Sequence, residues 1–421
     1  MDLLCDNVVY NGKGRVAIEF GESASLIAYC YFSNASAARI GLSRKLSLHI
    51  KDHGQVNASH IHSEEALSAS ARDVKATFRL SGKGIRLYPN KRKKLFSLDI
   101  SVFNFHRFSV SDLCSETDKW RISFKQIEEP SQGNKTSHRA SQYCLSHLVT
   151  ATRRDGKLFS LSEAEEFLST FRTLLAFANG MPTFAGLCIG RSRSGDVLLQ
   201  EWSAPASIAM RARFSWLDES LGSSLIEFIP AFYRLAESGS LGKACSEAVY
   251  WYLQSNVGGA SHGIDGGLIL SHAALHRLSL SYLGGKRKKS AAEDIREAAT
   301  KLKIPVFIPK ELAASHTAKR KKAWSDTPDA INKMRNDLIH PKPYLAISKR
   351  KVVPETWRLA QWYVELFILA LSGYTGRYSR RTRRGMHNGE TEYVPWARRN
   401  ARRSTRQQHC PHNIQMQKSG A

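Results

Sequence analysis

The sequence has little that would support a disulfide framework, a membrane span or a metal site. Its seven cysteines are scattered without a Cys-x-x-Cys pair, so we expect reduced thiols. The most apolar segment, 359–371, is shorter than the roughly 20 residues that span a bilayer, and it contains Gln361 and Glu365. The N-terminus lacks the basic start and long apolar core of a signal peptide. We therefore predict a cytoplasmic protein with no membrane span and no metal or other cofactor.

Negative charge is also scarce. The 421 residues contain 62 Lys+Arg against 37 Asp+Glu, which gives a formal net charge of +25. Such an excess does not specify a fold, but it favours a polyanionic partner, either nucleic acid or an anionic membrane surface. The hydrophobic content of 42% is enough for two or three domains with their own cores.

The first 150 residues have the pattern of β-strands. Runs rich in branched and aromatic residues, such as RVAIEF at 15–20 and SLIAYCYF at 25–32, alternate with turn sequences that contain Gly and Asn. We predict a β-rich domain over 1–150. Residues 151–205 have the pattern of one helix followed by a hairpin, which would complete that domain. The helix is expected to start with a capping box, in which Ser162 is followed by Glu165.

From residue 206 the apolar period becomes helical. Helices are expected at 219–237, 242–255, 264–283, 290–303, 327–340 and 354–373. Residues 397–421 are rich in arginine and poor in apolar residues, which predicts a disordered basic tail. The predicted fold class is α+β, with an N-terminal β-rich domain, an all-α helical domain at 206–396 and the tail.

The helix predicted at 327–340 has strong signals at both ends. Thr327 supplies an N-cap hydroxyl, Pro328 suits the first turn, and Asp329 lies near the positive end of the helix dipole. Pro341 ends the helix. The last turns have the sequence RNDLIH, so an arginine, an asparagine and a histidine occur within six residues at the end of this helix.

Two of these residues, Arg335 and His340, have the chemistry of a metal-free ribonuclease. Histidine changes charge near neutral pH, so His340 can act as a general acid or base. Arg335 offers a planar fork of donors that suits a phosphate. RNA cleavage without metal needs a group that takes the proton from a 2′-hydroxyl and a cation that stabilises the charge growing on the phosphate. An arginine and a histidine at this spacing are common in helices, so the spacing alone does not decide the function.

The stretch RNDLIHP resembles the signature of HEPN domains, in which an arginine, usually followed by a polar residue, precedes a histidine by a few positions. Its surroundings are similar to the HEPN region of bacterial ApeA-like anti-phage proteins over roughly 200–400. That similarity includes VYWYLQSN at 249–256, GLILSHAALHRLSLSYL at 267–283 and EYVPW at 392–396.

The resemblance implies an all-α bundle that forms a homodimer with two motifs facing one cleft. It implies a metal-independent endoribonuclease that leaves a 2′,3′-cyclic phosphate, with Arg335 and His340 as catalytic residues and Asn336 as a hydrogen-bonding accessory. It also implies abortive infection in anti-phage defence, with RNA as substrate, tRNA among the candidates, and a phage-derived trigger sensed by the N-terminal domain. The apolar surface of helix 354–373, with Trp357, Trp362, Phe367 and Leu371, is where we expect the dimer to form.

His272 and His276 lie four residues apart on one predicted helix. This spacing occurs in zinc sites, but Ala273 stands where zinc proteases carry glutamate, and no third ligand is evident. We expect the pair to line the bundle or an RNA cleft. HEPN proteins often carry an acidic residue in this helix, and here His276 takes that place.

The basic runs KRKK and the arginine-rich tail are candidates for phosphate contacts, although such runs are also common in solvated loops. The residues expected to bind RNA are Lys286, Arg287, Lys288, Lys289, Lys319, Arg320, Lys321, Lys322, Arg398 and Arg399.

Two alternatives to a nuclease remain open from the sequence. A non-catalytic RNA-binding or regulatory module would keep the bundle and the positive charge without cleaving RNA. A membrane-surface or scaffold protein would use the arginine-rich tail and would have no use for the RNDLIH stretch.

Overall fold

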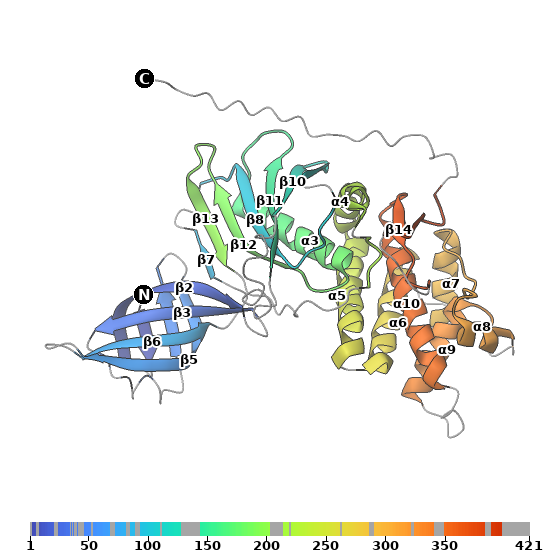
Figure 1. Ribbon diagram of the computed structural model, residues 1–421. Coiled ribbons are helices and arrows are strands. Elements are labelled where there is room, and N and C mark those ends of the chain that lie inside the picture. Colours follow the sequence, from blue (N-terminus) through green and yellow to red (C-terminus); the bar gives the residue numbers. More distant parts are fainter. Residues whose placement is uncertain are drawn as a thin grey trace.

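The computed structural model shows an α+β protein with a β-rich N-terminal region and a helical C-terminal region (Figure 1). It describes residues 2–5, 8–20, 24–33, 35, 37, 40, 46–51, 54–67, 72–80, 85–88, 93–109, 112–127, 144–202, 214–218, 220–261, 263–285, 290–320, 324–340, 349–383 and 389–397. In this part of the chain no helix is long and apolar enough to cross a membrane.

The first unit is a closed antiparallel barrel in the order β1-β2-β3-β6-β5-β4. Its strands are β1 (Asp2–Cys5), β2 (Val8–Phe20), β3 (Ala24–Ser33), β4 (Leu46–Ile50), β5 (Gly54–Leu67) and β6 (Arg72–Leu80). Alternate residues point inward, because successive side chains of a strand face opposite sides. In β6, for example, Val74 and Phe78 are buried, whereas Lys75 and Arg79 are exposed.

The second unit is a seven-stranded antiparallel sheet in the order β7-β13-β12-β8-β11-β10-β9. Its strands are β7 (Ile85–Leu87), β8 (Ser97–Phe103), β9 (Asp112–Glu116), β10 (Trp120–Gln126), β11 (Leu145–Arg153), β12 (Phe184–Arg191) and β13 (Val197–Trp202). The helix α3 (Leu161–Asn179) packs on this sheet, where the rings of Phe167 and Trp120 lie 4.7 Å apart. The sheet therefore joins strands from the predicted ranges 1–150 and 151–205.

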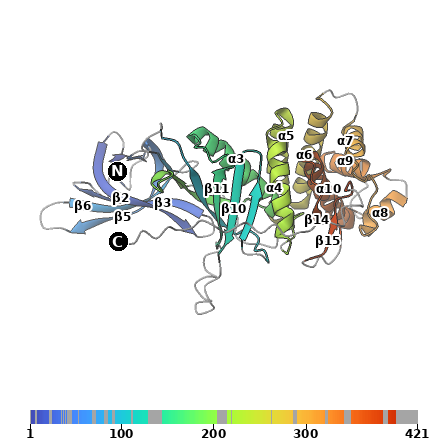
Figure 2. The ribbon, with the colours of Figure 1, turned by 90° about the horizontal axis from the view of Figure 1, so that it is seen from above.

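The third unit contains helices α4 (Gly222–Ala236), α5 (Ser240–Ser261), α6 (Gly263–Tyr282), α7 (Ala291–Lys301), α8 (Ala313–Arg320), α9 (Thr327–Ile339) and α10 (Lys349–Leu371). It also contains a short hairpin of β14 (Arg377–Ser379) and β15 (Thr391–Tyr393), so the expectation of an all-α region was wrong. Figure 2 shows the barrel, the sheet and the helices in a row.

The position of α10 corrects another expectation. Trp362 and Phe367 are 1% and 0% exposed, because neighbouring elements of the same chain surround the helix. Trp357 and Leu371 of the same expected surface are half-buried, so most of the apolar surface of α10 packs inside the chain. The polar line along the helix is also internal, since Gln361 and Glu365 are fully buried.

Two separate hydrophobic clusters hold these units together. The larger cluster runs without interruption from the sheet and α3 through the helices. The smaller cluster fills the barrel, and it is joined from outside by Ile85 and Leu87 of β7 and by Trp202 of β13. The barrel thus has its own core, whereas the sheet and the helices share one.

Two helix starts differ from the sequence prediction. The capping box of α3 is formed by Ser160 and Glu163, two residues before the predicted pair. The N-cap of α9 is Asp326, whose carboxylate accepts a hydrogen bond from the backbone N–H of Asp329 at 2.9 Å. Thr327, the predicted cap, instead donates its hydroxyl to the carbonyl of Phe307 at 2.9 Å.

Candidate functional site

The start of α9 is fixed by contacts with its neighbours. Nη2 of Arg296, on α7, lies 3.1 Å from Oδ1 of the N-cap residue Asp326. Ala330, Ile331 and Met334 are buried against the bundle. Because one end and one face of α9 are held in this way, the other face and the last turn have a defined position.

The predicted catalytic residues lie at the C-terminal end of α9. Arg335 is half-buried, and Asn336 and His340 are exposed. His340 is the C-cap, and its backbone N–H donates to the carbonyl of Asn336 at 2.8 Å. Residues 341–348 lie outside the described part of the chain.

The guanidinium of Arg335 has no carboxylate partner among the described residues. Its Nη1 donates to Oδ1 of Asn336 at 3.0 Å, and its Nε is buried without a hydrogen-bond partner. A buried donor without an acceptor carries a desolvation cost of about 1–3 kcal/mol. No described carboxylate competes for the half-buried guanidinium, so a phosphate can pair with it.

A second group of polar residues connects α9 to α6. Nε2 of His272 lies 3.1 Å from Oδ1 of Asn332, so this nitrogen donates its proton to the amide oxygen. Burial lowers the pKa of His272 to about 4, although the bond to Asn332 opposes this shift, and the charge of Arg335 lowers it further. His272 is therefore neutral at pH 7 and serves to position Asn332, one turn before Arg335.

The same face of α6 carries His276, whose Nε2 lies 3.4 Å from Oδ2 of Asp294 on α7. Asp294 is buried, whereas His276 is half-buried. The imidazole thus has an acidic neighbour that comes from another helix. The sequence did not predict the role of Asp294, because its contact joins two different helices. The one local signal is the capping box of Ser290 and Glu293, which fixes the start of α7 and so places Asp294 in its first turn.

The described residues contain no group of three or more His, Cys, Asp or Glu side chains that could hold a metal ion. His272 and His276 are neighbours, with ring centroids 6.2 Å apart, but each is occupied by a partner from another helix.

The predicted RNA-binding residues fall mostly outside the described part of the chain. This applies to 286–289, 321–322 and 398–399. Lys319 and Arg320 lie at the end of α8, and the structure does not describe their side chains. Their role in RNA binding stays a prediction.

Two family models match this chain. The model described as YopA central domain matches residues 90–212, and the model described as YopA C-terminal domain matches residues 238–392. The chain is similar to YopA proteins. The SPbeta prophage-derived uncharacterized protein YopA of Bacillus subtilis (strain 168) is 26% identical over 271 residues, which cover 61% of this chain.

The alignment covers 59% of that relative, so the similarity extends over less than two thirds of its length. No solved structure matches the chain. The C-terminal match includes α9 and the residues Arg335, Asn336 and His340, whereas both matches lie beyond the barrel at 2–80.

Proposed function

We propose that this protein is a metal-independent endoribonuclease of HEPN type, which cleaves RNA by attack of the 2′-hydroxyl and leaves a 2′,3′-cyclic phosphate. The observation that carries the proposal is the guanidinium of Arg335, which no described carboxylate pairs and which lies five residues before the exposed C-cap His340. The resemblance of residues 335–341 to the HEPN signature supports the same function.

Each of the three residues has a defined task in this reaction. The guanidinium of Arg335 binds the non-bridging oxygens of the scissile phosphate, where negative charge grows in the transition state. Asn336 holds that guanidinium through its side-chain oxygen. His340 takes the proton from the 2′-hydroxyl or gives one to the leaving 5′-oxygen.

The reaction needs both a base and an acid, and the motif of one chain supplies one histidine. We therefore propose a two-fold homodimer in which His340 of each copy faces one cleft. Most of the surface expected from sequence packs inside the chain, since Trp362 and Phe367 of α10 are buried. Ile339 is 38% exposed directly beside His340, which favours the end of α9 as part of the contact.

We also propose abortive infection in anti-phage defence as the biological setting, with a phage-derived trigger. The resemblance to ApeA-like proteins is the support for this part of the proposal. The basic runs and the tail would add phosphate contacts in which sequence is not read.

The decisive experiment is to incubate the purified protein with total RNA, with and without excess EDTA, and to analyse the new ends. We expect cleavage in EDTA with 2′,3′-cyclic phosphate ends, and its loss in His340→Ala. His49→Ala is a matched control, because the His49 side chain is 60% exposed on the barrel. Wild-type cleavage by His340→Ala would exclude this site. Activity lost in EDTA and restored by Zn²⁺ would point to a metal enzyme instead.

A non-catalytic RNA-binding module is the second candidate. The observation that favours it is His276, which stands where HEPN proteins often carry an acid. RNA binding by the wild-type protein without any cleavage would support this candidate.

A further inference from the structure

Four neighbouring strands of the barrel carry two rows of side chains on the outer surface. The register places Arg15, Tyr29, Thr77 and His62 in one row, and Lys13, Tyr31, Lys75 and Glu64 in the next. Each row crosses β2, β3, β6 and β5 in that order, and the two rows are separated by two residues along each strand. We refer to these eight side chains as the barrel face.

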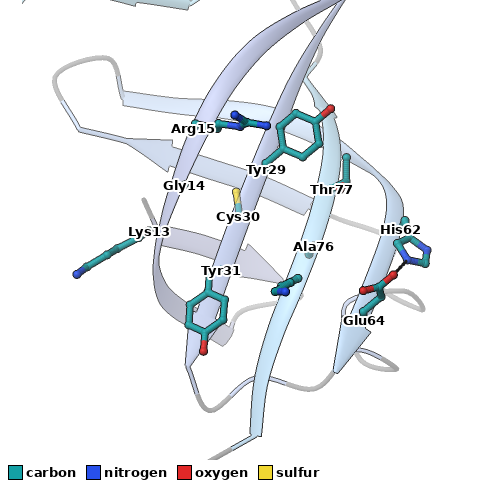
Figure 3. A pocket seen from close by; sticks show the side chains of 11 residues that line it. Lys13, Gly14, Arg15, Tyr29, Cys30, Tyr31, His62, Glu64, Ala76 and Thr77 are labelled. Carbon is teal, nitrogen blue, oxygen red and sulfur yellow. Dashed lines mark hydrogen bonds and ion pairs between the residues drawn. The ribbon is translucent and has the colours of Figure 1, made fainter. Parts of the chain in front are cut away.

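A cavity of about 600 Å³ lies over the barrel face (Figure 3). Its floor is formed by the residues between the two rows, including Gly14, Cys30 and Ala76. Gly14 has no side chain, and Cys30 and Ala76 are 5% and 3% exposed because their side chains point into the barrel core. No bulky side chain of these three residues therefore fills the middle of the face.

The thiol of Cys30 contributes no reactive group to the floor, because its side chain points into the barrel core. Burial raises the pKa of the Cys30 thiol to about 12, so it remains protonated at neutral pH. A protonated thiol is neither a nucleophile nor a metal ligand.

The walls of the cavity combine cations with aromatic rings. Lys13, Arg15 and Lys75 are exposed, and the guanidinium of Arg15 lies 5.0 Å from the centre of the Tyr29 ring. Tyr31 is 39% exposed on the same side of β3, about 7 Å further along the strand.

The barrel face contains one carboxylate, that of Glu64, which contacts the imidazole of His62. Glu64 lies 2.9 Å from Nε2 of His62, and this contact lowers the pKa of the carboxyl. Glu64 remains ionised, but the three cations outnumber this one carboxylate, so the surface is positive and a polyanion is the complementary partner.

We propose that the barrel face binds single-stranded nucleic acid. Bases stack on aromatic rings exposed on a sheet, and nearby lysine and arginine side chains contact the phosphates. The barrel face offers the exposed ring of Tyr31 and the half-buried ring of Tyr29 on one strand, with cations on both sides, over an open hollow. Aromatic rings beside phosphate-binding cations suit a chain of flat bases that phosphates link together.

The face lies at the opposite end of the molecule from α9 (Figures 1 and 2). The inference does not depend on the proposed ribonuclease function. A nucleic acid bound here would be held by a surface that is separate from Arg335 and His340.

The test uses the full-length protein and a fluorescent 20-nucleotide oligo(dT), because DNA has no 2′-hydroxyl and is not a substrate for the proposed cleavage. Fluorescence anisotropy at 200 mM salt should show binding that Tyr31→Ala or Tyr29→Ala weakens about tenfold. Tyr31→Phe should bind like the wild type because it retains the ring. Tyr250→Ala is the aromatic control, since Tyr250 is 60% exposed on α5, and it should have no effect.

The cations are tested by the salt dependence of the same binding. Lys13→Ala with Lys75→Ala should reduce the slope of log K against log salt by about 1.4, or about 0.7 for each phosphate that is no longer neutralised. Lys157→Ala, which removes a lysine that is 79% exposed elsewhere, should leave the slope unchanged.

Thermal unfolding of each variant shows whether it is folded. If a Tyr→Ala variant does not fold, Tyr31→Phe and the lysine variants still test the proposal. Wild-type affinity in both Tyr→Ala variants would overturn the proposal. A second result would also overturn it. If the barrel-face variants bind oligo(dT) like the wild type but no longer bind phosphatidylserine vesicles, the face is a membrane-contact surface.

Discussion

The guanidinium of Arg381 lies 2.6 Å from Oε1 of Glu365, and both side chains are buried inside the helical region. The hydroxyl of Tyr252 donates to the same oxygen at 2.6 Å. Arg381 also donates to Oδ1 of Asn256 at 3.0 Å and to the carbonyl of Phe214 at 2.6 Å. One arginine thus fastens the segment after β14 to α5, to α10 and to the residues that precede α4.

Replacing Arg381 should destabilise the protein strongly. Arg381→Met leaves the carboxylate of Glu365 buried without its cation, which costs about 3–5 kcal/mol in the free energy of unfolding. The double variant Arg381→Met/Glu365→Leu should recover part of that loss because no buried charge remains. Urea unfolding measures both effects.

Arg383→Ala is the matched control for that experiment. Arg383 is 39% exposed and pairs with Glu392 at 2.5 Å, so its loss should cost no more than about 1 kcal/mol. An equal loss in Arg381→Met and Arg383→Ala would contradict the role assigned to the buried pair.

Arg335→Lys should restore little of the RNA cleavage that Arg335→Ala loses. Lysine keeps the charge but cannot present two parallel donors to a phosphate or hold the contact to Asn336. We expect Arg335→Ala to lower the cleavage rate about 10²- to 10³-fold, the cost of removing one transition-state donor. Initial rates on a defined RNA oligonucleotide measure this.

Lys333→Ala should cleave at nearly the wild-type rate, because the Lys333 side chain is 52% exposed and lies 3.0 Å from Asp329 on the same helix. If Arg335→Lys were as active as the wild type, charge alone would explain the role of Arg335, and the bidentate geometry would be excluded.

Stability should fall in mild acid because of His147. This side chain is 1% exposed between Phe105 and Phe108, and neither ring nitrogen has a hydrogen-bond partner in the described part of the chain. Burial, with smaller contributions from Arg107 and His106, lowers the pKa of His147 to about 4.

The unfolded chain takes up this proton near its ordinary pKa of about 6.5, whereas the folded chain takes it up near 4. The stabilisation is therefore complete above pH 6.5 and is lost as the pH falls toward 4. The expected loss is about 3 kcal/mol. Urea unfolding of His147→Phe between pH 7 and pH 4 should show a flatter profile than the wild type, and His49→Ala should follow the wild type. A parallel profile in His147→Phe would assign the acid sensitivity to other groups, such as His272.

Mixed dimers should test the shared cleft. When His340→Ala chains exchange fully with an equal amount of wild-type chains, only about a quarter of the dimers carry two intact motifs. At the same total protein concentration, the rate of RNA cleavage by the mixture should therefore be about a quarter of the rate of wild type alone. Activity that falls only to half would show that each chain works alone, and His276 beside Asp294 would then be the second imidazole to replace.

Removing 397–421 should weaken RNA binding most at low salt and make its salt dependence shallower. The arginines of this segment, which include Arg398 and Arg399, would act by releasing counterions from the phosphates. Filter binding over a range of salt concentrations measures the slope. An unchanged slope would show that the tail does not contact RNA.

The sequence predicted those helices and hairpins well whose limits depend on neighbouring residues of the chain. The helical period placed α9 within a residue of its observed ends, and the turn sequence predicted the hairpin of β12 and β13. The end of α9 at His340 also agrees, since Pro341 cannot continue a helix. The helix α8 was missed because its eight residues are too few to show a period.

Contacts between distant segments could not be read in the same way. The strand β7 leaves the barrel sequence and pairs with β13, more than a hundred residues later. Asp294 reaches His276 from another helix, and Arg381 reaches Glu365 from beyond the end of α10. Such pairs depend on how elements pack, which no single stretch of sequence records.

The separate core of the barrel has a consequence for how this protein evolves. A β-structure that buries its own apolar side chains can be exchanged for another unit if the contacts of Ile85, Leu87 and Trp202 are preserved. The sheet and the helices have no such freedom, because a substitution in α3 is felt by the same cluster that supports α10. Related proteins should therefore differ most in the N-terminal unit, and they should retain the sheet and the helices together.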